Sequence, residues 1–287
     1  MTPATATLAG RPVARIGYGA MQLTHGGRVT PADALAVLRQ AVAAGANHLD
    51  TAQFYGAGAC NTLIREALAP YPDTLVLATK VGADNTDAAG HGLVPAQLPG
   101  QLRGQVEQNL ATLGVDRLDL VYLRRLDTQP GIIATGEQVV DLEDQLAELA
   151  ALREEGKIGA VGLSNVSADQ LRRALPAGIE AVQNLYGLLE RADQPVYDLC
   201  RAHGIAWVPF CPLGSAFPDR PKVWQDPKTN AVARELGATP AQVALAWLLQ
   251  DYPRTLLIPG TADPAHLAEN LAAADLELPP EAVSALA

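Results

Sequence analysis

The sequence has few aromatic residues, few cysteines and no long hydrophobic run. Aromatic residues make up 5% of the 287 residues, and there are three cysteines, Cys60, Cys200 and Cys211. Three widely spaced cysteines fit neither a disulfide framework nor a zinc site, so we expect reduced thiols and no bound metal. The longest apolar stretches, such as residues 242–250, are much shorter than the roughly 18 residues that a membrane span needs.

Positive charge is also scarce. The chain has 21 lysines and arginines against 31 aspartates and glutamates, for a net charge of −10. No basic stripe interleaved with aromatic residues is present, so we expect no nucleic-acid partner. The N-terminal residues lack the basic start and apolar core of a signal peptide. We therefore expect a cytoplasmic protein that does not contact a membrane, and its oligomeric state stays open.

The apolar residues, which with cysteine and tyrosine make up 48% of the chain, follow a strand-then-helix rhythm. A possible N-terminal hairpin, residues 5–8 and 13–15, comes first. Eight short apolar strands are then predicted at residues 16–21, 47–50, 74–80, 118–123, 158–164, 181–185, 205–210 and 255–260. Eight helices follow them in turn at residues 30–45, 59–69, 95–114, 137–156, 167–175, 194–204, 239–252 and 263–274.

This alternation predicts an α/β fold with parallel strands, because each helix is a crossover between two strands. Eight such units without a linker predict one domain, residues 1–287, folded as a (β/α)₈ TIM barrel. The alternative is a doubly wound open sheet, which requires a G-x-G-x-x-G turn after the first strand. The sequence there reads GYGAMQLTHGG and does not match, so the barrel is favoured.

Polar residues stand where the predicted strands end. In a barrel of this kind the chemistry takes place at the carboxyl ends of the strands. Most of the residues at those ends are polar, and all are expected to converge on one mouth: Asp50, Lys80, Arg124, Ser164, Asn165, Gln183, Phe210 and Ile258 to Thr261. Tyr55 lies in the loop just after the second strand.

Three of these residue types suit proton transfer to an oxygen. A tyrosine phenol has an ordinary pKa near 10, and we expect the ammonium of Lys80 to lower the pKa of Tyr55 toward neutrality. Asp50 would hold Lys80 charged and oriented. The trio would then protonate a carbonyl oxygen as it becomes an alcohol. The alternative is that Asp50 and Lys80 form a structural ion pair against which Tyr55 merely packs.

The sequence resembles the aldo-keto reductase superfamily, and the resemblance extends across nearly the whole chain. LDTAQFYGAG is similar to the family's Asp–Tyr segment, and LATKVG to its catalytic lysine segment. VGLSN, VQNLYGLLER, PFCPLGSAF and LLIPGTADPAHLAEN resemble its nicotinamide- and phosphate-binding segments. The run from Val161 to Asn270 is most similar to a bacterial branch that includes pyridoxal reductases.

The resemblance implies a nicotinamide dinucleotide bound across the barrel mouth without a Rossmann fold. The residues expected at the cofactor are Gly19, Met21, Asp50, Ser164, Asn165, Gln183, Phe210, Pro212, Leu213, Gly214, Ser215, Ile258, Gly260, Thr261, His266, Glu269 and Asn270. By position, Ser164, Asn165 and Gln183 would hold the carboxamide, and Phe210 would stack on the nicotinamide ring. Backbone groups of residues 213–215 would meet the pyrophosphate, because free N–H groups bind phosphate.

The sequence departs from the family at the end of the fourth strand. The family usually has a histidine there, whereas this chain has Arg124. An arginine is bulkier than a histidine and always charged. It would polarise the carbonyl, or bind an anionic group of the substrate, and we assign Arg124 to the catalytic set. The alternative is that Arg124 turns outward and pairs with Asp127 or Asp119.

A second departure concerns the cofactor. Family members that select NADPH often carry lysine and arginine after the eighth strand, where this chain has Gly260 and His266. We still predict NADPH over NADH, with Thr261 and His266 serving the 2′-phosphate and Lys222 or Lys228 reaching over from the loop after Phe210.

We therefore expect an NADPH-dependent oxidoreductase that reduces a small carbonyl compound, with an aromatic aldehyde such as pyridoxal as the best candidate. The chain ends soon after a short helix predicted from Pro280, so the pocket is expected to be open. One alternative is a nicotinamide-binding regulatory protein with vestigial chemistry. Another is an epimerase or dehydratase that recycles its cofactor within each turnover.

Overall fold

A computed structural model of the protein describes residues 5–25, 29–87, 90, 92–214 and 220–286. Seven parallel strands form one curled sheet in the order β11-β10-β9-β8-β5-β4-β3. Their bounds are β3 (Tyr18–Gly19), β4 (His48–Asp50), β5 (Val76–Val81), β8 (Leu118–Arg124), β9 (Ile158–Ser164), β10 (Ile179–Gln183) and β11 (Ala206–Trp207). Apart from the step between β5 and β8, sequence neighbours are sheet neighbours, as a barrel requires.

Residues 255–258 close the sheet, although they form only isolated bridges. Thr255 pairs in parallel with Trp207 on one side, and Leu257 pairs in parallel with Ile16 on the other. The Leu257 N–H donates to the Arg15 carbonyl at 2.8 Å, and the Leu256 N–H donates to the Trp207 carbonyl at 2.8 Å. The predicted eighth strand therefore occupies its place, and the predicted (β/α)₈ barrel is confirmed.

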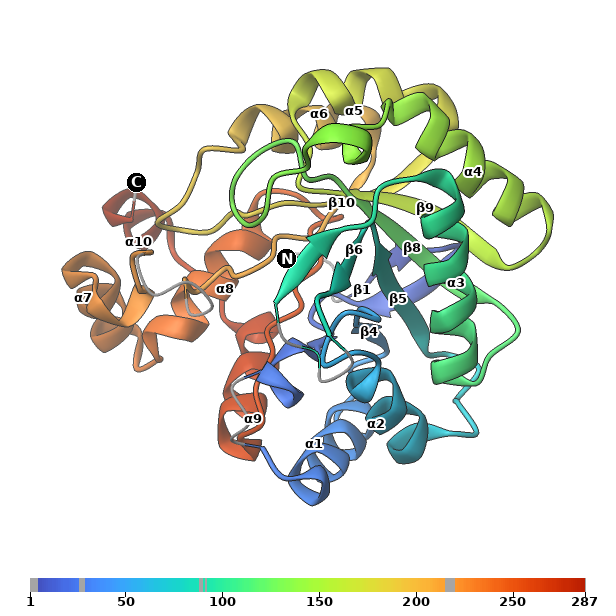
Figure 1. Cartoon of the computed structure of the whole chain (residues 1–287). Coiled ribbons are helices and arrows are strands. Elements are labelled where there is room, and N and C mark those ends of the chain that lie inside the picture. The colour runs from blue at the N-terminus through green and yellow to red at the C-terminus, as the bar shows by residue number, and fades with distance from the viewer. Residues whose placement is uncertain (1–4, 26–28, 88–89, 91, 215–219, 287) are drawn as a thin grey trace.

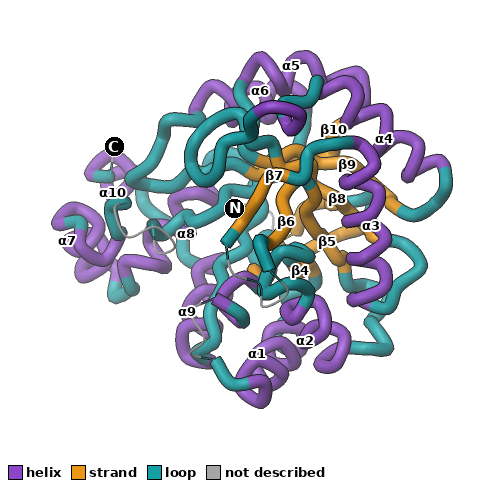
Figure 2. The backbone as a smooth tube through the Cα atoms, in the orientation of Figure 1, coloured by secondary structure: helices purple, strands orange, loops and turns teal. Residues whose placement is uncertain are grey.

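The helices surround the strands, as Figures 1 and 2 show. Their bounds are α1 (Pro31–Ala43), α2 (Ala59–Leu68), α3 (Pro99–Leu113), α4 (Leu142–Glu154), α5 (Ala168–Ala174), α6 (Gln194–His203), α7 (Pro227–Leu236), α8 (Pro240–Gln250), α9 (Pro264–Ala272) and α10 (Pro280–Ala285). Two of them have threonine caps at their first turn: Thr30 and Thr239 each accept a backbone N–H from three residues further on, at 3.2 Å. None of the helices within the described ranges is long and apolar enough to cross a membrane.

The N-terminal hairpin covers the end of the barrel at which the strands begin. Strands β1 (Thr5–Leu8) and β2 (Arg11–Ala14) pair antiparallel, as predicted. Leu8 and Val13 are fully buried and pack in one cluster with Val76, Leu120 and Leu256, which lie on or beside the barrel strands. Because the hairpin fills this end, the cavity lies at the opposite end, where the strands finish.

The structure differs from the predicted elements in three places. Helix α4 begins at Leu142, because residues 136–138 form a separate short 3₁₀ turn. Helix α7 lies in a stretch predicted as loop, and Asp226, which accepts the Thr229 N–H at 2.7 Å, caps its start. A second hairpin, β6 (Ala83–Asn85) with β7 (Leu93–Pro95), follows β5. Its three-residue strands are too short to show a period in the sequence.

Candidate active site

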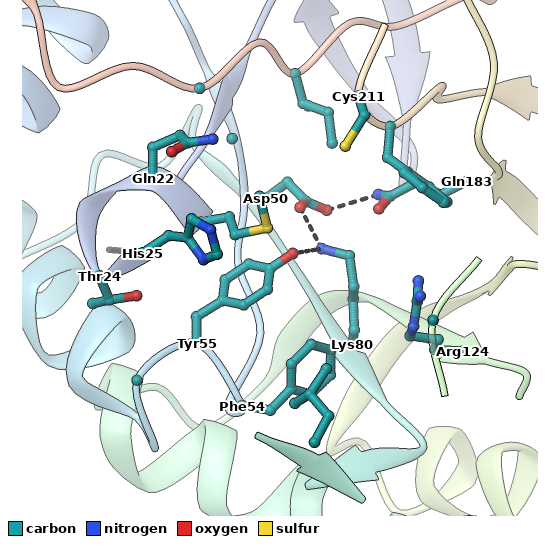
Figure 3. Close-up of a pocket in the computed structure, with 18 of the residues that line it drawn as sticks. Gln22, Thr24, His25, Asp50, Phe54, Tyr55, Lys80, Arg124, Gln183 and Cys211 are labelled. Carbon is teal, nitrogen blue, oxygen red and sulfur yellow. Dashed lines mark hydrogen bonds and ion pairs between the residues drawn. The ribbon is translucent and has the colours of Figure 1, made fainter. Parts of the chain in front are cut away.

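A cavity of about 1000 Å³ opens at the carboxyl ends of the strands. Strand ends supply its polar floor: Gly19, Asp50, Lys80, Arg124 and Gln183 all line it. The parallel register explains why they meet, since Gly19 lies beside Asp50 and Arg124 lies beside Ser164 in the sheet. Groups more than 160 residues apart in the sequence therefore share one chamber (Figure 3).

Lys80 is the centre of a buried polar cluster (Figure 3). Its ammonium forms an ion pair with Asp50 and donates to the Tyr55 hydroxyl at 3.1 Å and to the Thr51 carbonyl at 3.1 Å. Asp50 and Lys80 are almost fully buried, at 4% and 3% exposure. Charges this deeply buried need partners of opposite sign, and Asp50 and Lys80 are partners for each other.

The pKa of Tyr55 is raised above its ordinary value, contrary to our expectation. Burial of the phenol is the largest cause; Lys80 and Arg124 lower the pKa, and Asp50 raises it. The pKa of Lys80 is raised as well: burial works against the ammonium, but Asp50 and Tyr55 together outweigh it. Tyr55 therefore keeps its proton at neutral pH, next to an ammonium that favours release of that proton.

Gln183 holds the other oxygen of Asp50. Its Nε2 donates to Asp50 Oδ2 at 2.8 Å, so the carboxylate is fixed between Gln183 and Lys80. One amide hydrogen of Gln183 is thus committed within the protein. This amide, expected at the cofactor carboxamide, positions Asp50 in the structure.

Arg124 lines the cavity and does not turn outward. Its Nη2 lies 3.5 Å from the Pro130 carbonyl, and its guanidinium carbon lies 5.7 Å from the centre of the Phe210 ring. The expected alternative partners are taken by other arginines: Asp127 pairs with Arg125, and Asp119 pairs with Arg11.

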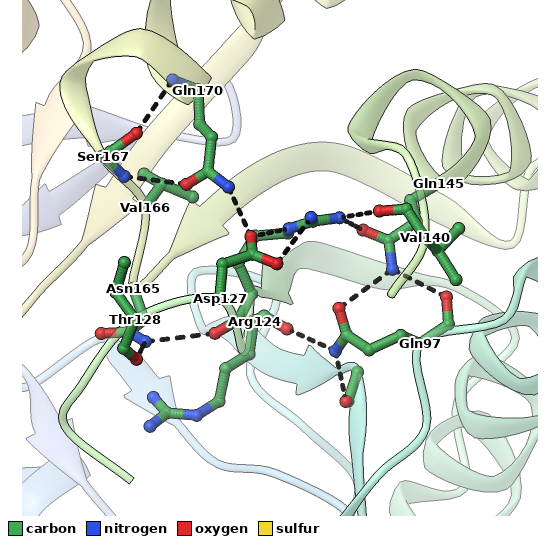
Figure 4. A network of polar contacts seen from close by, with 12 residues as sticks. Gln97, Arg124, Asp127, Thr128, Val140, Gln145, Asn165, Val166, Ser167 and Gln170 are labelled. Atoms are coloured by element: carbon green, nitrogen blue, oxygen red, sulfur yellow. Dashed lines mark hydrogen bonds and ion pairs between the residues drawn. The ribbon is translucent and has the colours of Figure 1, made fainter. Parts of the chain in front are cut away.

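Of the two adjacent arginines, Arg124 and Arg125, it is Arg125 that has a structural role. It donates to Asp127 at 2.7 and 2.9 Å and to the Val140 carbonyl at 2.9 Å, and it also contacts Gln145. Figure 4 shows the guanidinium of Arg124 pointing away from Asp127 and Gln145. Successive residues of an extended segment point to opposite faces. Arg124, the last residue of β8, therefore points into the cavity, and Arg125, which follows it, points into the surrounding layer.

The residues expected at the cofactor fall into two groups. Nine of them line the cavity: Gly19, Met21, Asp50, Gln183, Phe210, Pro212, Leu213, Ile258 and Gly260. Seven others lie outside its lining: Ser164, Asn165, Gly214, Thr261, His266, Glu269 and Asn270. Ser215 lies outside the described residues.

Gly19 and Gly260 have a structural reason to be glycine. A Cβ on Gly19 would collide with the Ile258 carbonyl oxygen, and a Cβ on Gly260 would collide with the Gly19 carbonyl oxygen. The two backbones approach each other at the cavity rim, where the last barrel segment meets β3. Only residues without a side chain allow this approach.

Ser164 and Asn165 differ in whether their side-chain polar atoms already have hydrogen-bond partners. The Ser164 hydroxyl is buried and has no hydrogen-bond partner in the part of the chain that the structure describes. Asn165 adopts a left-handed backbone with φ of 58°, and its Nδ2 donates to the Thr128 carbonyl at 2.9 Å and the Arg125 carbonyl at 3.2 Å. Its amide hydrogens therefore tie down the loop after β8.

Residues 261–270 adjoin the cavity at the start of α9. The Thr261 carbonyl accepts the Tyr18 hydroxyl at 2.5 Å, and Asp263 caps the helix by accepting the Ala265 N–H at 2.7 Å. His266 is exposed on the first turn of α9, Glu269 is half-buried and Asn270 is buried. A helix N-terminus of this kind favours an anion, which suits the phosphate end of a dinucleotide.

Sequence reasoning missed a set of residues that form the outer part of the cavity. They come from loops and from the β6–β7 hairpin: Gln22, Thr24, His25, Phe54, Asn85, Leu93, Ile132 and Cys211. Phe54 was detectable, because it directly precedes Tyr55, and the two rings lie edge to face at 5.3 Å. Cys211 was detectable too, because it directly follows Phe210 at a predicted strand end. The others follow no strand end and carried no signal.

Comparisons with known proteins agree with this geometry. The family model described as "Aldo/keto reductase family" matches residues 15–287. Pyridoxine 4-dehydrogenase of Escherichia coli (strain K12) is 44% identical, over 100% of this chain and 98% of that protein. Probable aldo-keto reductase 1 of Glycine max is 32% identical, over 94% of this chain and 83% of that protein.

Solved structures resemble the whole barrel. The aldo-keto reductase from Klebsiella pneumoniae in complex with NADPH has a TM-score of 0.80 at 26% identity, covering 100% of this chain and 94% of that one. A second structure from Klebsiella pneumoniae, an aldo/keto reductase with NADP and acetate, has a TM-score of 0.81 at 25% identity, covering 99% and 94%.

Proposed function

Because the chain belongs to the aldo/keto reductase family, we propose that it uses NADPH to reduce an aldehyde to an alcohol, with Tyr55 as the proton donor. When bound, the cofactor supplies the hydride that the carbonyl carbon receives. The observation that carries the proposal is the contact of the Tyr55 hydroxyl with the Lys80 ammonium, 3.1 Å away, on the wall of the cavity.

Tyr55, Lys80 and Asp50 divide the work of proton transfer. Tyr55 holds its proton at neutral pH, since burial raises its pKa. As negative charge develops on the carbonyl oxygen, the phenol gives up that proton, and the phenolate left behind is stabilised by Lys80. Asp50 keeps Lys80 charged and fixed in place. Arg124 orients the substrate. In the view of Figure 3, Arg124 and Tyr55 lie on opposite sides of Lys80.

The residues present fit a nicotinamide dinucleotide. The buried Ser164 hydroxyl has no partner among the described residues, and Gln183 lines the cavity; these observations support our proposal that the two residues bind the carboxamide. Phe210 also lines the cavity and offers an aromatic face. The NADPH held by the Klebsiella pneumoniae structure supports the same cofactor here.

We propose NADPH over NADH, although the chain lacks the paired lysine and arginine of many NADPH-selective relatives. His266 is exposed on the first turn of α9 and would meet the 2′-phosphate. Lys222 contacts the Gly214 carbonyl and thus sits by the loop that would cover the pyrophosphate. A kcat/KM for NADPH equal to that for NADH would contradict this part of the proposal.

Pyridoxal is the proposed substrate. Its support is the 44% identity to a protein named pyridoxine 4-dehydrogenase, together with the apolar residues of the outer cavity, Phe54, Leu93 and Ile132, which would pack on an aromatic ring. We also propose that the protein works in the cytoplasm, where the buried thiols of Cys60 and Cys200 would stay reduced.

The test is a turnover experiment. The purified protein is mixed with NADPH and pyridoxal, and both cofactor oxidation and the appearance of pyridoxine are followed. We expect one pyridoxine for each NADPH oxidised. Tight NADPH binding without oxidation would favour a regulatory protein instead. A changed substrate with no net oxidation would favour an epimerase or dehydratase.

A further inference from the structure

Arg124 is a cation at the cavity that lacks a carboxylate partner among the residues that the structure describes. Lys80, the other lysine or arginine in the lining, is neutralised by Asp50. Arg124 makes no ion pair with any residue that the structure describes. Its nearest polar contact is the Pro130 carbonyl at 3.5 Å, at the outer limit of a hydrogen bond.

Within the described part of the chain, the surroundings of Arg124 do not compensate its charge. Burial lowers the pKa of Arg124 below its ordinary value, and the groups that counteract this, Tyr55 and Cys211, are neutral in their ordinary protonated forms. The aromatic ring of Phe210 at 5.7 Å supplies only a weak attraction. A guanidinium held in this way gains most from an anion that enters the cavity, because the pair then forms away from bulk water.

The local fold does not require Arg124 to be charged. The structural contacts after β8 are made by Arg125, which binds Asp127 and the Val140 carbonyl. Arg124 contributes its backbone carbonyl, which accepts the Gln97 amide at 2.9 Å, and any residue could do this. The guanidinium is therefore free to serve a ligand, and its planar fork suits an oxyanion.

We propose that Arg124 binds an anionic oxygen substituent of the substrate, so that the enzyme prefers aromatic aldehydes carrying a phenolate or carboxylate over neutral aldehydes of the same shape. This inference rests on the proposed function, and narrows its substrate class. Phe54, Leu93 and Ile132 contact the ring, Tyr55 meets the carbonyl oxygen and Arg124 meets the acidic substituent.

The test compares 3-formylbenzoate with its methyl ester, which has the same ring and aldehyde but no charge. At moderate salt, which screens the net charge of −10, we expect the parent to prefer the acid by about tenfold or more in kcat/KM. Arg124→Met should abolish this preference, and Arg124→Lys should restore part of it. If Arg124→Met slows both substrates by the same factor, Arg124 acts on the carbonyl and the inference is wrong.

A control variant and a binding measurement separate this inference from the proposed function. Arg172→Met removes an exposed arginine on α5 that does not line the cavity, and should leave the preference unchanged. Calorimetry with benzoate and benzamide needs no turnover: benzoate should bind more tightly to the parent but not to Arg124→Met. Equal affinities in the parent would overturn the inference even if pyridoxal is reduced. If neither aldehyde is reduced, the proposed function fails, and the calorimetry still decides the role of Arg124.

Discussion

The two walls of the cavity are built differently. We call one the acid–base wall; its members project from β4, β5, β8 and the loop after β4, and are Asp50, Tyr55, Lys80 and Arg124. We call the other the cofactor wall; its members are Gln183, Phe210, Leu213, Ile258 and Gly260. The first contains a buried ion pair and the hydrogen bond to Tyr55. The second consists mainly of apolar side chains and backbone atoms. Among its five members, only Gln183 contacts the polar cluster, through its hydrogen bond to Asp50.

This difference matches the division of roles that we propose. The groups proposed to move a proton are fixed by one another, because their charges need partners when buried. Groups that bind a dinucleotide need only shape, an aromatic face and accessible backbone. Variants of the acid–base wall should therefore affect the rate of reduction, and variants of the cofactor wall should affect NADPH affinity.

The largest expected effect comes from Lys80→Met. This variant removes the ammonium that stabilises the Tyr55 phenolate, and it leaves Asp50 without its buried counter-charge. We expect kcat/KM for pyridoxal to fall by about 10²–10⁴-fold, the range of a general acid–base contribution. NADPH affinity, measured by fluorescence titration, should change little. A similar loss in both quantities would remove the distinction between the walls.

The opposite end of β4 should control stability rather than activity. Burial lowers the pKa of His48 to about 4. Its unfolded pKa is near 6.5, so the unfolded chain binds the proton first as the pH falls, and stability is lost between pH 6.5 and 4. The loss should approach about 3 kcal/mol at pH 4.

Urea unfolding of the parent and of His48→Gln across this pH range measures that effect. The variant should have a flatter pH dependence, whatever its stability at pH 8. His203→Gln, which removes an exposed histidine at the end of α6, serves as the control. If the parent's slope between pH 6.5 and 4 persists unchanged in His48→Gln, other groups cause it.

A smaller effect is expected on the cofactor wall. Phe210→Leu keeps an apolar side chain but removes the aromatic face, so NADPH should bind about two- to tenfold more weakly. The rate at saturating NADPH should stay near that of the parent. Phe210→Tyr, which restores the ring, should bind like the parent. A leucine variant with normal affinity and a reduced rate would place Phe210 in the chemistry instead.

The smallest effect is expected outside both walls. Trp224 is 47% exposed and does not line the cavity, although it stands in the long segment between Phe210 and α8. Trp224→Ala should leave kcat/KM for pyridoxal within about twofold of the parent, since exposed substitutions away from a site are nearly neutral. A larger loss would extend the substrate site beyond the cavity.

The sequence was more informative about the acid–base wall than about the rest. Asp50, Lys80 and Arg124 end apolar runs, so the strand pattern alone placed them at one mouth. The direction of the Tyr55 pKa was missed, because burial depends on Phe54 and on loops that carry no periodic signal. The hydrogen bond from the Asn165 amide to the Thr128 carbonyl also carried no signal in the sequence, because Thr128 belongs to a loop whose path is set by tertiary contacts. Helix α7 could have been recognised from Asp226 and Pro227 at its start.

The most direct test of this account is Tyr55→Phe, measured for both chemistry and binding. The variant keeps the ring that contacts Phe54 and loses only the hydroxyl beside Lys80. We expect NADPH to bind within about twofold of the parent while the single-turnover rate of pyridoxal reduction falls at least about 100-fold. A variant that reduces pyridoxal as fast as the parent would contradict the assignment of Tyr55 as the proton donor.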